Sequence, residues 1–260
     1  MKVVLFCGGL GMRLHPDTEK IPKPLVTVGD QPLLLHLMKY YAYFGHKDFI
    51  LCLGYKGDLI KKFFLNYDEC LNNDFILLEG GKKKALFKSS MQDWRITFAE
   101  TGLHSNIGQR LKSVQKYVED DEIFLANYSD GLTDLSLKDE INFFLNRGKI
   151  ACFLAVKPCY VFHSVSIDAN NLATSIRSVS DSNLRINGGY FVFKNSIFDY
   201  INEGEDLVNE PFQRLIKKRE LLAFNYAGFW ASLDTFKDKL RLDELVANGN
   251  GLWKIWEKKE

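Results

Sequence analysis

Short apolar runs that alternate with amphipathic helical stretches constrain the fold of this 260-residue chain more than any other feature. Runs typical of buried strands lie at residues 3–7, 48–53, 75–78, 95–99, 123–127, 150–156, 189–193 and 222–224. Apolar residues recur with helical spacing at residues 32–44, after Gly57, at 111–118 and at 141–145. The alternation predicts an α/β fold with a Rossmann-like, mostly parallel sheet and helices on both faces. In such sheets ligands bind at the carboxyl ends of the strands, so a site is expected in the segments that follow them.

The segment after the first strand is rich in glycine and is followed by two cations. Gly8, Gly9 and Gly11 let the backbone turn sharply and bring N–H groups close to an anion. Arg13 and Lys23 add positive charge, so the segment is suited to the phosphates of a nucleotide. The glycines alone fit a plain tight turn equally well. The spacing matches neither the dinucleotide-binding fingerprint nor a P-loop, which excludes hydride transfer and P-loop kinase chemistry.

Charge and cysteine content narrow the class of protein and its partners. The net charge of +1 argues against nucleic acid as the main partner, because nucleic-acid binding usually needs a strong basic excess. The five cysteines are odd in number and widely spaced, which favours reduced thiols over disulfides. No apolar run approaches the 18 residues of a membrane-spanning helix. We therefore expect a soluble, cytoplasmic, single-domain protein that binds no membrane.

Two aspartates are candidate ligands for a magnesium ion. Asp130 follows the run at 123–127 and precedes Gly131. A carboxylate at the end of a central strand suits Mg²⁺, which takes one or two protein carboxylates and completes its shell with water and phosphate oxygens. An aspartate that starts a β-turn is the alternative. Asp234 precedes Thr235 and could equally belong to a helix N-cap.

Short motifs along essentially the whole chain, in a fixed order, carry a resemblance to a known family. They lie at residues 8–14, 22–24, 54–57, 101–102, 108–111, 128–131, 186–189, 209–211, 228–230, 233–235 and 253–256. With these motifs the chain resembles the sugar-1-phosphate nucleotidylyltransferases, and most closely the glucose-1-phosphate cytidylyltransferases. The resemblance implies a Mg²⁺-dependent transfer of a cytidylyl group from CTP to a phosphorylated acceptor, with release of pyrophosphate, for surface-polysaccharide precursors. It also implies a homo-oligomer.

The resemblance implies a role for individual residues in this sequence. Arg13, Lys23 and Asp130 would be catalytic, and Asp130 and Asp234 would hold Mg²⁺. Residues expected to bind the nucleotide are Gly8, Gly9, Leu10, Gly11, Met12, Arg13, Lys23, Thr101, Gly102, Arg110 and Asp130. Residues 1–135 would mainly bind the nucleotide, and residues 150–260 would form a smaller part with acceptor-binding and C-terminal elements.

The acceptor half departs from the family pattern. Asn187, Gly188, Glu210 and Trp230 fall where the family binds its acceptor, but the segment 175–181 lacks the Glu-Lys-Pro motif whose lysine contacts the acceptor phosphate. Three explanations stay open. The further acceptor candidates Arg177 or Arg185 replace the lysine, the acceptor is not a hexose phosphate, or the protein is a nucleotide-binding pseudo-enzyme with a regulatory role. His163, which stands where the family has glycine, belongs to the same altered pocket or is a plain polar residue.

Overall fold

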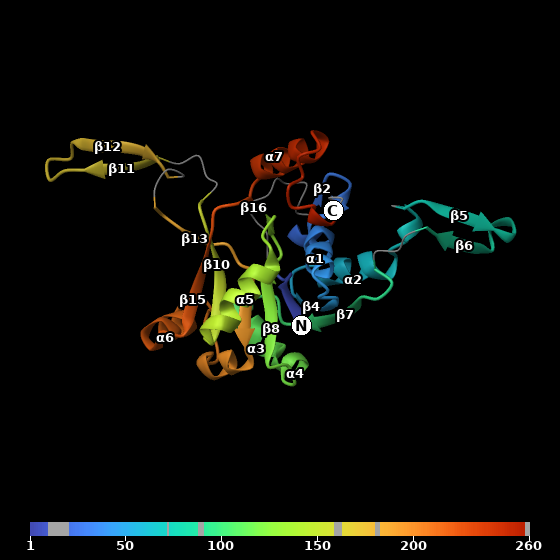
Figure 1. Ribbon diagram of the computed structural model, residues 1–260, viewed down its shortest axis with the longest axis horizontal. Coiled ribbons are helices and arrows are strands. Elements are labelled where there is room, and N and C mark those ends of the chain that lie inside the picture. The colour runs from blue at the N-terminus through green and yellow to red at the C-terminus, as the bar shows by residue number, and fades with distance from the viewer. Residues whose placement is uncertain (10–20, 72, 88–90, 159–162, 180–182, 258–260) are drawn as a thin grey trace.

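A computed structural model describes residues 1–9, 21–71, 73–87, 91–158, 163–179 and 183–257. Its centre is an eight-stranded sheet of order β13-β10-β14-β8-β1-β4-β7, in which β15 pairs with β10. The strands are β1 (Lys2–Phe6), β4 (Asp48–Leu53), β7 (Arg95–Glu100), β8 (Ile123–Tyr128), β10 (Ala151–Val156), β13 (Ile186–Asn187), β14 (Phe191–Lys194) and β15 (Leu221–Tyr226). Figure 1 shows this sheet through the middle of the molecule.

Most neighbours in the sheet are parallel, as the alternating pattern predicted. Strand β1 pairs in parallel with β4 and β8, β4 with β7, and β10 with β15. Strand β14 runs antiparallel to β8 and β10, and β13 runs antiparallel to β10. The central strands read as continuous apolar runs because both of their faces are covered. The carboxyl ends of β1, β4, β7 and β8 therefore meet at one edge, where the site was expected.

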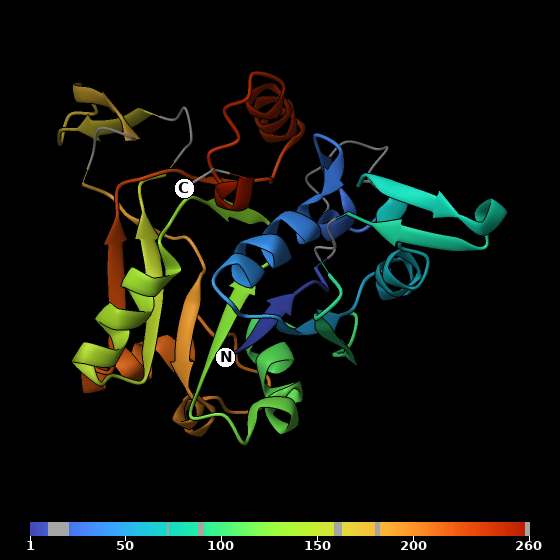
Figure 2. The same ribbon diagram turned by 45° about the vertical axis from the view of Figure 1, so that its right-hand side comes forward.

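Helices cover both faces of the sheet, which confirms the predicted layers (Figure 2). One face carries α1 (Leu33–Tyr43), α2 (Gly57–Leu65) and α5 (Leu137–Arg147). Helix α7 (Phe236–Ala247) packs on β2 (Thr27–Val28), beyond the carboxyl ends of the strands (Figure 1). The other carries α3 (Ile107–Ser113), α4 (Gln115–Val118) and α6 (Glu210–Lys218). Val3 packs in the first of the two cores and Val4 in the second, as the two-residue period of a strand requires. None of the helices in the described residues is long and apolar enough to cross a membrane.

Smaller elements complete the fold. Short two-stranded sheets are formed by β2 (Thr27–Val28) with β3 (Gln31–Pro32), β5 (Phe75–Leu78) with β6 (Lys83–Leu86), β9 (Gly131–Thr133) with β16 (Trp230–Ser232), and β11 (His163–Ile167) with β12 (Ala173–Ser178). Single 3-10 turns are η2 (Lys23–Leu25), η3 (Glu69–Leu71), η4 (Glu79–Gly81), η6 (Asn195–Tyr200) and η7 (Ile255–Glu257). The hairpins β5–β6 and β11–β12 project at opposite ends of the molecule (Figure 1).

Three predicted elements differ in detail from the structure. The apolar run at 75–78 forms β5 of a projecting hairpin and not a strand of the central sheet. The helix expected at 111–118 is divided into α3 and α4 at Val114. The strand expected from residue 189 starts only at Phe191, because Gly189 and Tyr190 have positive φ angles of 79° and 50°. Local backbone geometry, which residue periodicity does not encode, decides the last of these differences.

Candidate active site at the carboxyl ends of the strands

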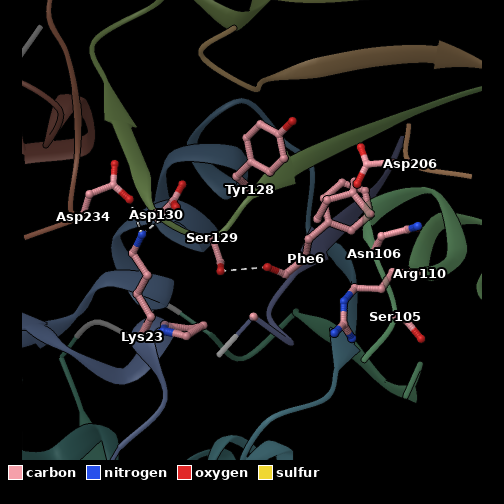
Figure 3. A pocket seen from close by; sticks show the side chains of 13 residues that line it. Phe6, Lys23, Ser105, Asn106, Arg110, Tyr128, Ser129, Asp130, Asp206 and Asp234 are labelled. Carbon is pink, nitrogen blue, oxygen red and sulfur yellow. Dashed lines mark hydrogen bonds and ion pairs between the residues drawn. The ribbon is translucent and has the colours of Figure 1, made fainter. Parts of the chain in front are cut away.

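A cavity of about 480 Å³ opens at the carboxyl ends of β1 and β8 (Figure 3). The residues that line it are Phe6, Gly9, Lys23, Pro24, Ser105, Asn106, Ile107, Arg110, Tyr128, Ser129, Asp130, Asp206 and Asp234. Phe6 ends β1 and Tyr128 ends β8, so the cavity lies at the edge that the alternating pattern had indicated. It gathers five of the predicted site residues: Gly9 and Lys23 after β1, Arg110 in α3, Asp130 after β8, and Asp234 near the C-terminal end of the chain.

One ammonium group and two carboxylates meet at one end of the cavity. Lys23 Nζ lies 2.7 Å from Asp130 Oδ2 and 2.8 Å from Asp234 Oδ1. Figure 3 shows both carboxylates directed at this ammonium group. Burial by itself would lower the pKa of Lys23, but the charges of Asp130 and Asp234 and their hydrogen bonds outweigh it, so the pKa is raised. Lys23 is therefore a protonated cation in this cavity.

The donor set of this cluster fits a divalent metal ion. Asp130 and Asp234 offer hard carboxylate oxygens from two chain segments, and both already surround a positive charge. Within the described ranges no group of three or more His, Cys, Asp or Glu side chains forms a closed metal site. Two carboxylates suffice for Mg²⁺, because this ion keeps several waters and binds substrate phosphates in its remaining positions.

Strand pairing explains how two aspartates that are distant in the sequence come together. Strand β9, directly after Asp130, pairs antiparallel with β16, and this pairing places Gly131 opposite Ser232. The backbone N–H of Leu233 donates to the carbonyl of Asp130 at 2.8 Å. On the other side, Ser129 Oγ donates to the carbonyl of Phe6 at 2.8 Å. The Asp130 segment is thus attached both to β1 and to the chain that carries Asp234.

Arg110 joins the ends of β1, β4 and β7 beneath the cavity. Its guanidinium donates to the carbonyl of Gly8 at 3.0 Å, to the carbonyl of Leu53 at 3.1 Å and to Thr101 Oγ1 at 2.8 Å. A further bond reaches the carbonyl of Leu103 at 3.4 Å. Because Arg110 is only 2% exposed and its donors face these protein acceptors, it shapes the glycine segment in this structure.

Gly8 is required by this arrangement. A Cβ atom at residue 8 would lie 2.1 Å from a guanidinium nitrogen of Arg110, which no side chain could accommodate without displacing the arginine. Gly102, which was predicted to bind the nucleotide, has a φ of 92° and so needs the conformational freedom of glycine. Thr101 Oγ1 also donates to the carbonyl of Leu53, at 2.7 Å. Gly8, Thr101 and Gly102 do not line the cavity themselves; Gly8 and Thr101 are hydrogen-bonded to Arg110, which does.

Some of the predicted acceptor residues lie together beside the cavity. Trp230 Nε1 donates to the carbonyl of Gly188 at 2.9 Å, and the Trp230 side chain is 9% exposed. Asn187 Nδ2 donates to the hydroxyl of Tyr128, a cavity residue, at 3.2 Å. The segment 187–188 and Trp230 are therefore continuous with the cavity through Tyr128.

The other acceptor candidates lie elsewhere in the described structure. His163 and Arg177 are exposed on the hairpin β11–β12, which projects from the body of the molecule (Figure 1). Arg185 donates to Asn225 Oδ1 at 2.8 Å, and Glu210 lines a separate hollow with Arg214 and other residues of α6. Leu10, Gly11, Met12 and Arg13 were predicted to bind the nucleotide and lie outside the described residues.

Several residues of the cavity were not predicted as site residues. Tyr128 lies two residues before the predicted Asp130, and its position at the end of a strand was a usable signal. Asn106 caps α3 in a capping box with Gln109, and this spacing can be read from the sequence. Asp206 comes from the acidic loop before α6 and carries no local signal for a cavity residue.

Comparisons with known proteins define the class. Residues 2–248 match the family model described as "Nucleotidyl transferase", and the chain belongs to this family. The protein is a nucleotidyltransferase, and the family resemblance that the motifs carried is confirmed.

More particular relatives cover the same length. The chain is 39% identical to the glucose-1-phosphate cytidylyltransferase of Salmonella typhi over 258 residues, which cover 99% of this chain and 100% of that protein. The corresponding protein of Salmonella typhimurium matches at the same identity and coverage. Among solved structures, HddC from Yersinia pseudotuberculosis superposes with a TM-score of 0.65 at 21% identity, covering 94% of this chain and 99% of that one. This last likeness supports the fold alone.

Proposed function

We propose that this protein transfers the cytidylyl group of CTP to a sugar 1-phosphate and releases pyrophosphate. One observation carries the proposal: the contact of Lys23 with Asp130 and Asp234 in a cavity at the carboxyl ends of the parallel strands. The cytidylyl group and the class of acceptor are inferred from the two Salmonella relatives, which are named glucose-1-phosphate cytidylyltransferases.

The chain's own residues would assist this transfer by position and charge, with no nucleophilic side chain. Asp130 and Asp234 would hold Mg²⁺, which supplies positive charge to the triphosphate when it is bound. Lys23 lies within reach of the same position, so its ammonium can pass from the two carboxylates to the phosphates as they enter. The positive charge of Arg13 would stabilise the negative charge on the departing pyrophosphate. Such electrostatic stabilisation in a preorganised site is commonly the largest part of catalysis.

The two halves of the chain would divide the substrates between them. Residues 1–135 contribute Gly9, Lys23 and Asp130 to the cavity, which suits the nucleotide. Residues 150–260 contribute Gly188 and Trp230 beside it, where an indole ring under a sugar is ordinary carbohydrate recognition. Glucose 1-phosphate is the first acceptor to test, although the segment 175–181 lacks the family's lysine. Arg185 is the cation of this half that we propose as its replacement, because Arg177 lies on the projecting hairpin β11–β12.

A turnover assay tests the proposed function. The protein is incubated with Mg²⁺, CTP and one of a panel of phosphorylated acceptors, among them glucose 1-phosphate and non-hexose phosphates, while pyrophosphate release is measured. We expect turnover with at least one sugar 1-phosphate and loss of it when Mg²⁺ is chelated. Binding of CTP without pyrophosphate release from any acceptor would favour a nucleotide-binding regulatory protein instead.

Substitution of the carboxylates tests the metal assignment. We expect Asp130→Asn or Asp234→Asn to lower kcat by roughly 10²- to 10³-fold, the scale of one strong electrostatic contact in a preorganised site. Asp93→Asn is a matched control, because Asp93 also pairs with a lysine, Lys47, at 2.5 Å but on the exposed surface. If both cavity variants turn over like the control, the two aspartates do not hold the metal.

We also infer that the protein acts in the cytoplasm, where CTP and sugar phosphates are formed. Its product would be an activated sugar for surface-polysaccharide precursors. A homo-oligomer is proposed as well, on the apolar surface that the projecting hairpins expose, and nucleic acid is not expected as a partner at a net charge of +1.

A further inference from the structure

Tyr190 has an unusual backbone conformation for a large, buried side chain. It is 1% exposed and lies between β13 and β14 with a φ of 50°. Bulky residues rarely adopt the left-handed region, and those that do are held there by their surroundings and gather at functional sites. The preceding Gly189 also has a positive φ, of 79°. The hydrogen bonds of Tyr190 therefore show what keeps it in this conformation and which segment it contacts.

Two hydrogen bonds connect Tyr190 to the segment that carries Asp130. Its backbone N–H donates to Asn127 Oδ1 at 2.9 Å, and its hydroxyl donates to the carbonyl of Gly131 at 3.0 Å. Asn127 lies three residues before Asp130, and Gly131 follows it directly. Tyr190 thus bonds to the chain before and after Asp130, the aspartate that is proposed to hold the metal.

The close approach of these segments also explains Gly189. A Cβ atom at residue 189 would lie 2.3 Å from Asn127 Oδ1, so a side chain there would separate Tyr190 from β8. The left-handed turn at residues 189–190 is what allows the tyrosine ring to reach beneath the Asp130 segment.

The segment that leads into Tyr190 belongs to the predicted acceptor site. Asn187 Nδ2 donates to the hydroxyl of Tyr128, and the carbonyl of Gly188 accepts from Trp230 Nε1. Residues 187–190 are therefore bonded at three points to residues 127, 128 and 131 of the metal-binding side. The acceptor segment is thus attached to the chain on both sides of Asp130.

We propose that Tyr190 is a positioning residue for Asp130: its backbone N–H and its hydroxyl hold Asn127 and the Gly131 carbonyl, on either side of Asp130, and thereby fix the path of the segment that carries the metal-binding carboxylate. This inference rests on the proposed function and deepens it. The Gly131 carbonyl belongs to the peptide unit between Gly131 and Leu132, one Cα beyond the unit that joins Asp130 to Gly131. Without this hydrogen bond Gly131 is freer to rotate, which would move the Asp130 carboxylate from its 2.7 Å contact with Lys23. Outer-shell partners that orient a metal ligand commonly change metal affinity or activity by about 10- to 100-fold, and for a partner that acts through the backbone we expect the lower end of this range.

Tyr40 provides a matched control in the same core. Its hydroxyl donates to the carbonyl of Leu135 at 2.9 Å, and the residue is 2% exposed. Its ring contacts that of Tyr190 edge to face, with centroids 5.3 Å apart. Tyr40→Phe therefore removes the same kind of buried hydroxyl-to-carbonyl bond, five residues beyond Asp130. A loss of activity or Mn²⁺ binding that both variants share reflects lower stability. A loss found only in Tyr190→Phe reflects the positioning of Asp130.

The experiment compares wild type, Tyr190→Phe and Tyr40→Phe by three measurements. Binding of Mn²⁺ in the presence of CTP is followed by the electron paramagnetic resonance signal of the free ion, turnover by pyrophosphate release, and folding by the thermal midpoint. We expect both variants to melt a few degrees lower, since each leaves a buried carbonyl without its donor. Only Tyr190→Phe should weaken Mn²⁺ binding and lower kcat, each by about tenfold, with the KM for CTP within about twofold of wild type.

The inference is overturned if Tyr190→Phe binds Mn²⁺ and turns over like Tyr40→Phe. A wild type that binds Mn²⁺ with CTP but releases no pyrophosphate would contradict the proposed function, while the Mn²⁺ comparison still decides the role of Tyr190. A wild type that binds no Mn²⁺ with CTP would overturn both.

Discussion

At the scale of single residues, the pKa values of two buried basic side chains shift in opposite directions. The pKa of Lys23 is raised because two carboxylates face its ammonium group. For His36 the shift is downward. Burial lowers its pKa to about 4, against an ordinary value of 6.5, although its contact with the Val28 carbonyl opposes the shift. His36 Nε2 lies 2.9 Å from that carbonyl, and Trp253 Nε1 donates to Nδ1 at 3.3 Å. The neutral ring, with its proton on Nε2, satisfies both contacts.

The lowered pKa of His36 predicts how the stability of the protein depends on pH. Because the folded pKa of His36 lies below the unfolded one, its contribution is fully present above pH 6.5 and is lost as the pH falls toward 4. A shift of this size corresponds to about 3 kcal/mol of unfolding free energy at most. We expect His36→Gln to be less stable at pH 7.5 and to lose less stability than wild type between pH 6.5 and 4. Urea unfolding at several pH values measures both, and parallel curves for the two proteins would contradict the assignment.

At the scale of elements, the ends of the strands are joined by contacts that only the assembled sheet creates. The sequence placed Gly8 and Asp130 after strands, and this was sufficient to locate the cavity. The meeting of Asp130 and Asp234 around Lys23 depends instead on the pairing of β9 with β16, two strands of three residues each that lie far apart in the chain. Such short strands carry no periodicity, so their pairing could not be predicted from the residues alone.

The glycines after β1 give a prediction with an internal control. Gly8→Ala places a methyl group against the Arg110 guanidinium at 2.1 Å, whereas a Cβ at residue 9 meets no atom within 4 Å. We expect Gly8→Ala to cost about 1–3 kcal/mol of stability through this overlap and to weaken CTP binding. Gly9→Ala should keep its stability, and a loss of CTP affinity in that variant alone would indicate that phosphate approaches the backbone there. Thermal melting and CTP titration separate the two effects, and equal stabilities would contradict the packing argument.

At the scale of the whole molecule, the sequence predicted the layers and the site edge better than the surface. The apolar run at 75–78 was expected to be a strand, and it is one, but its four side chains are exposed on a projecting hairpin. A short apolar run indicates a strand but does not show what covers it. The same limit applies to His163 and Arg177, whose hairpin extends from the body and not into the cavity (Figure 1).

This exposed hairpin leads to a prediction about assembly. Phe75 and Leu77 point to one face of β5 and Ile76 and Leu78 to the other, and all four are between 39% and 58% exposed. An isolated two-stranded hairpin is marginally stable in water, and large exposed apolar patches mark interaction surfaces. We expect the protein to self-associate through β5–β6, with light scattering after gel filtration giving a mass above the 29.9 kDa of one chain.

Substitution on the two hairpins locates the contact. Leu77→Asp places a charge in the β5–β6 surface and should yield monomers with an unchanged circular dichroism spectrum. Val165→Asp places the same charge on the other projecting hairpin, where Val165 is 51% exposed, and should leave the assembly intact if β5–β6 forms the interface. A wild type of monomeric mass would contradict self-association, and dissociation by Val165→Asp alone would assign it to β11–β12. Pyrophosphate release by the monomeric variant then shows whether each cavity is complete within one chain.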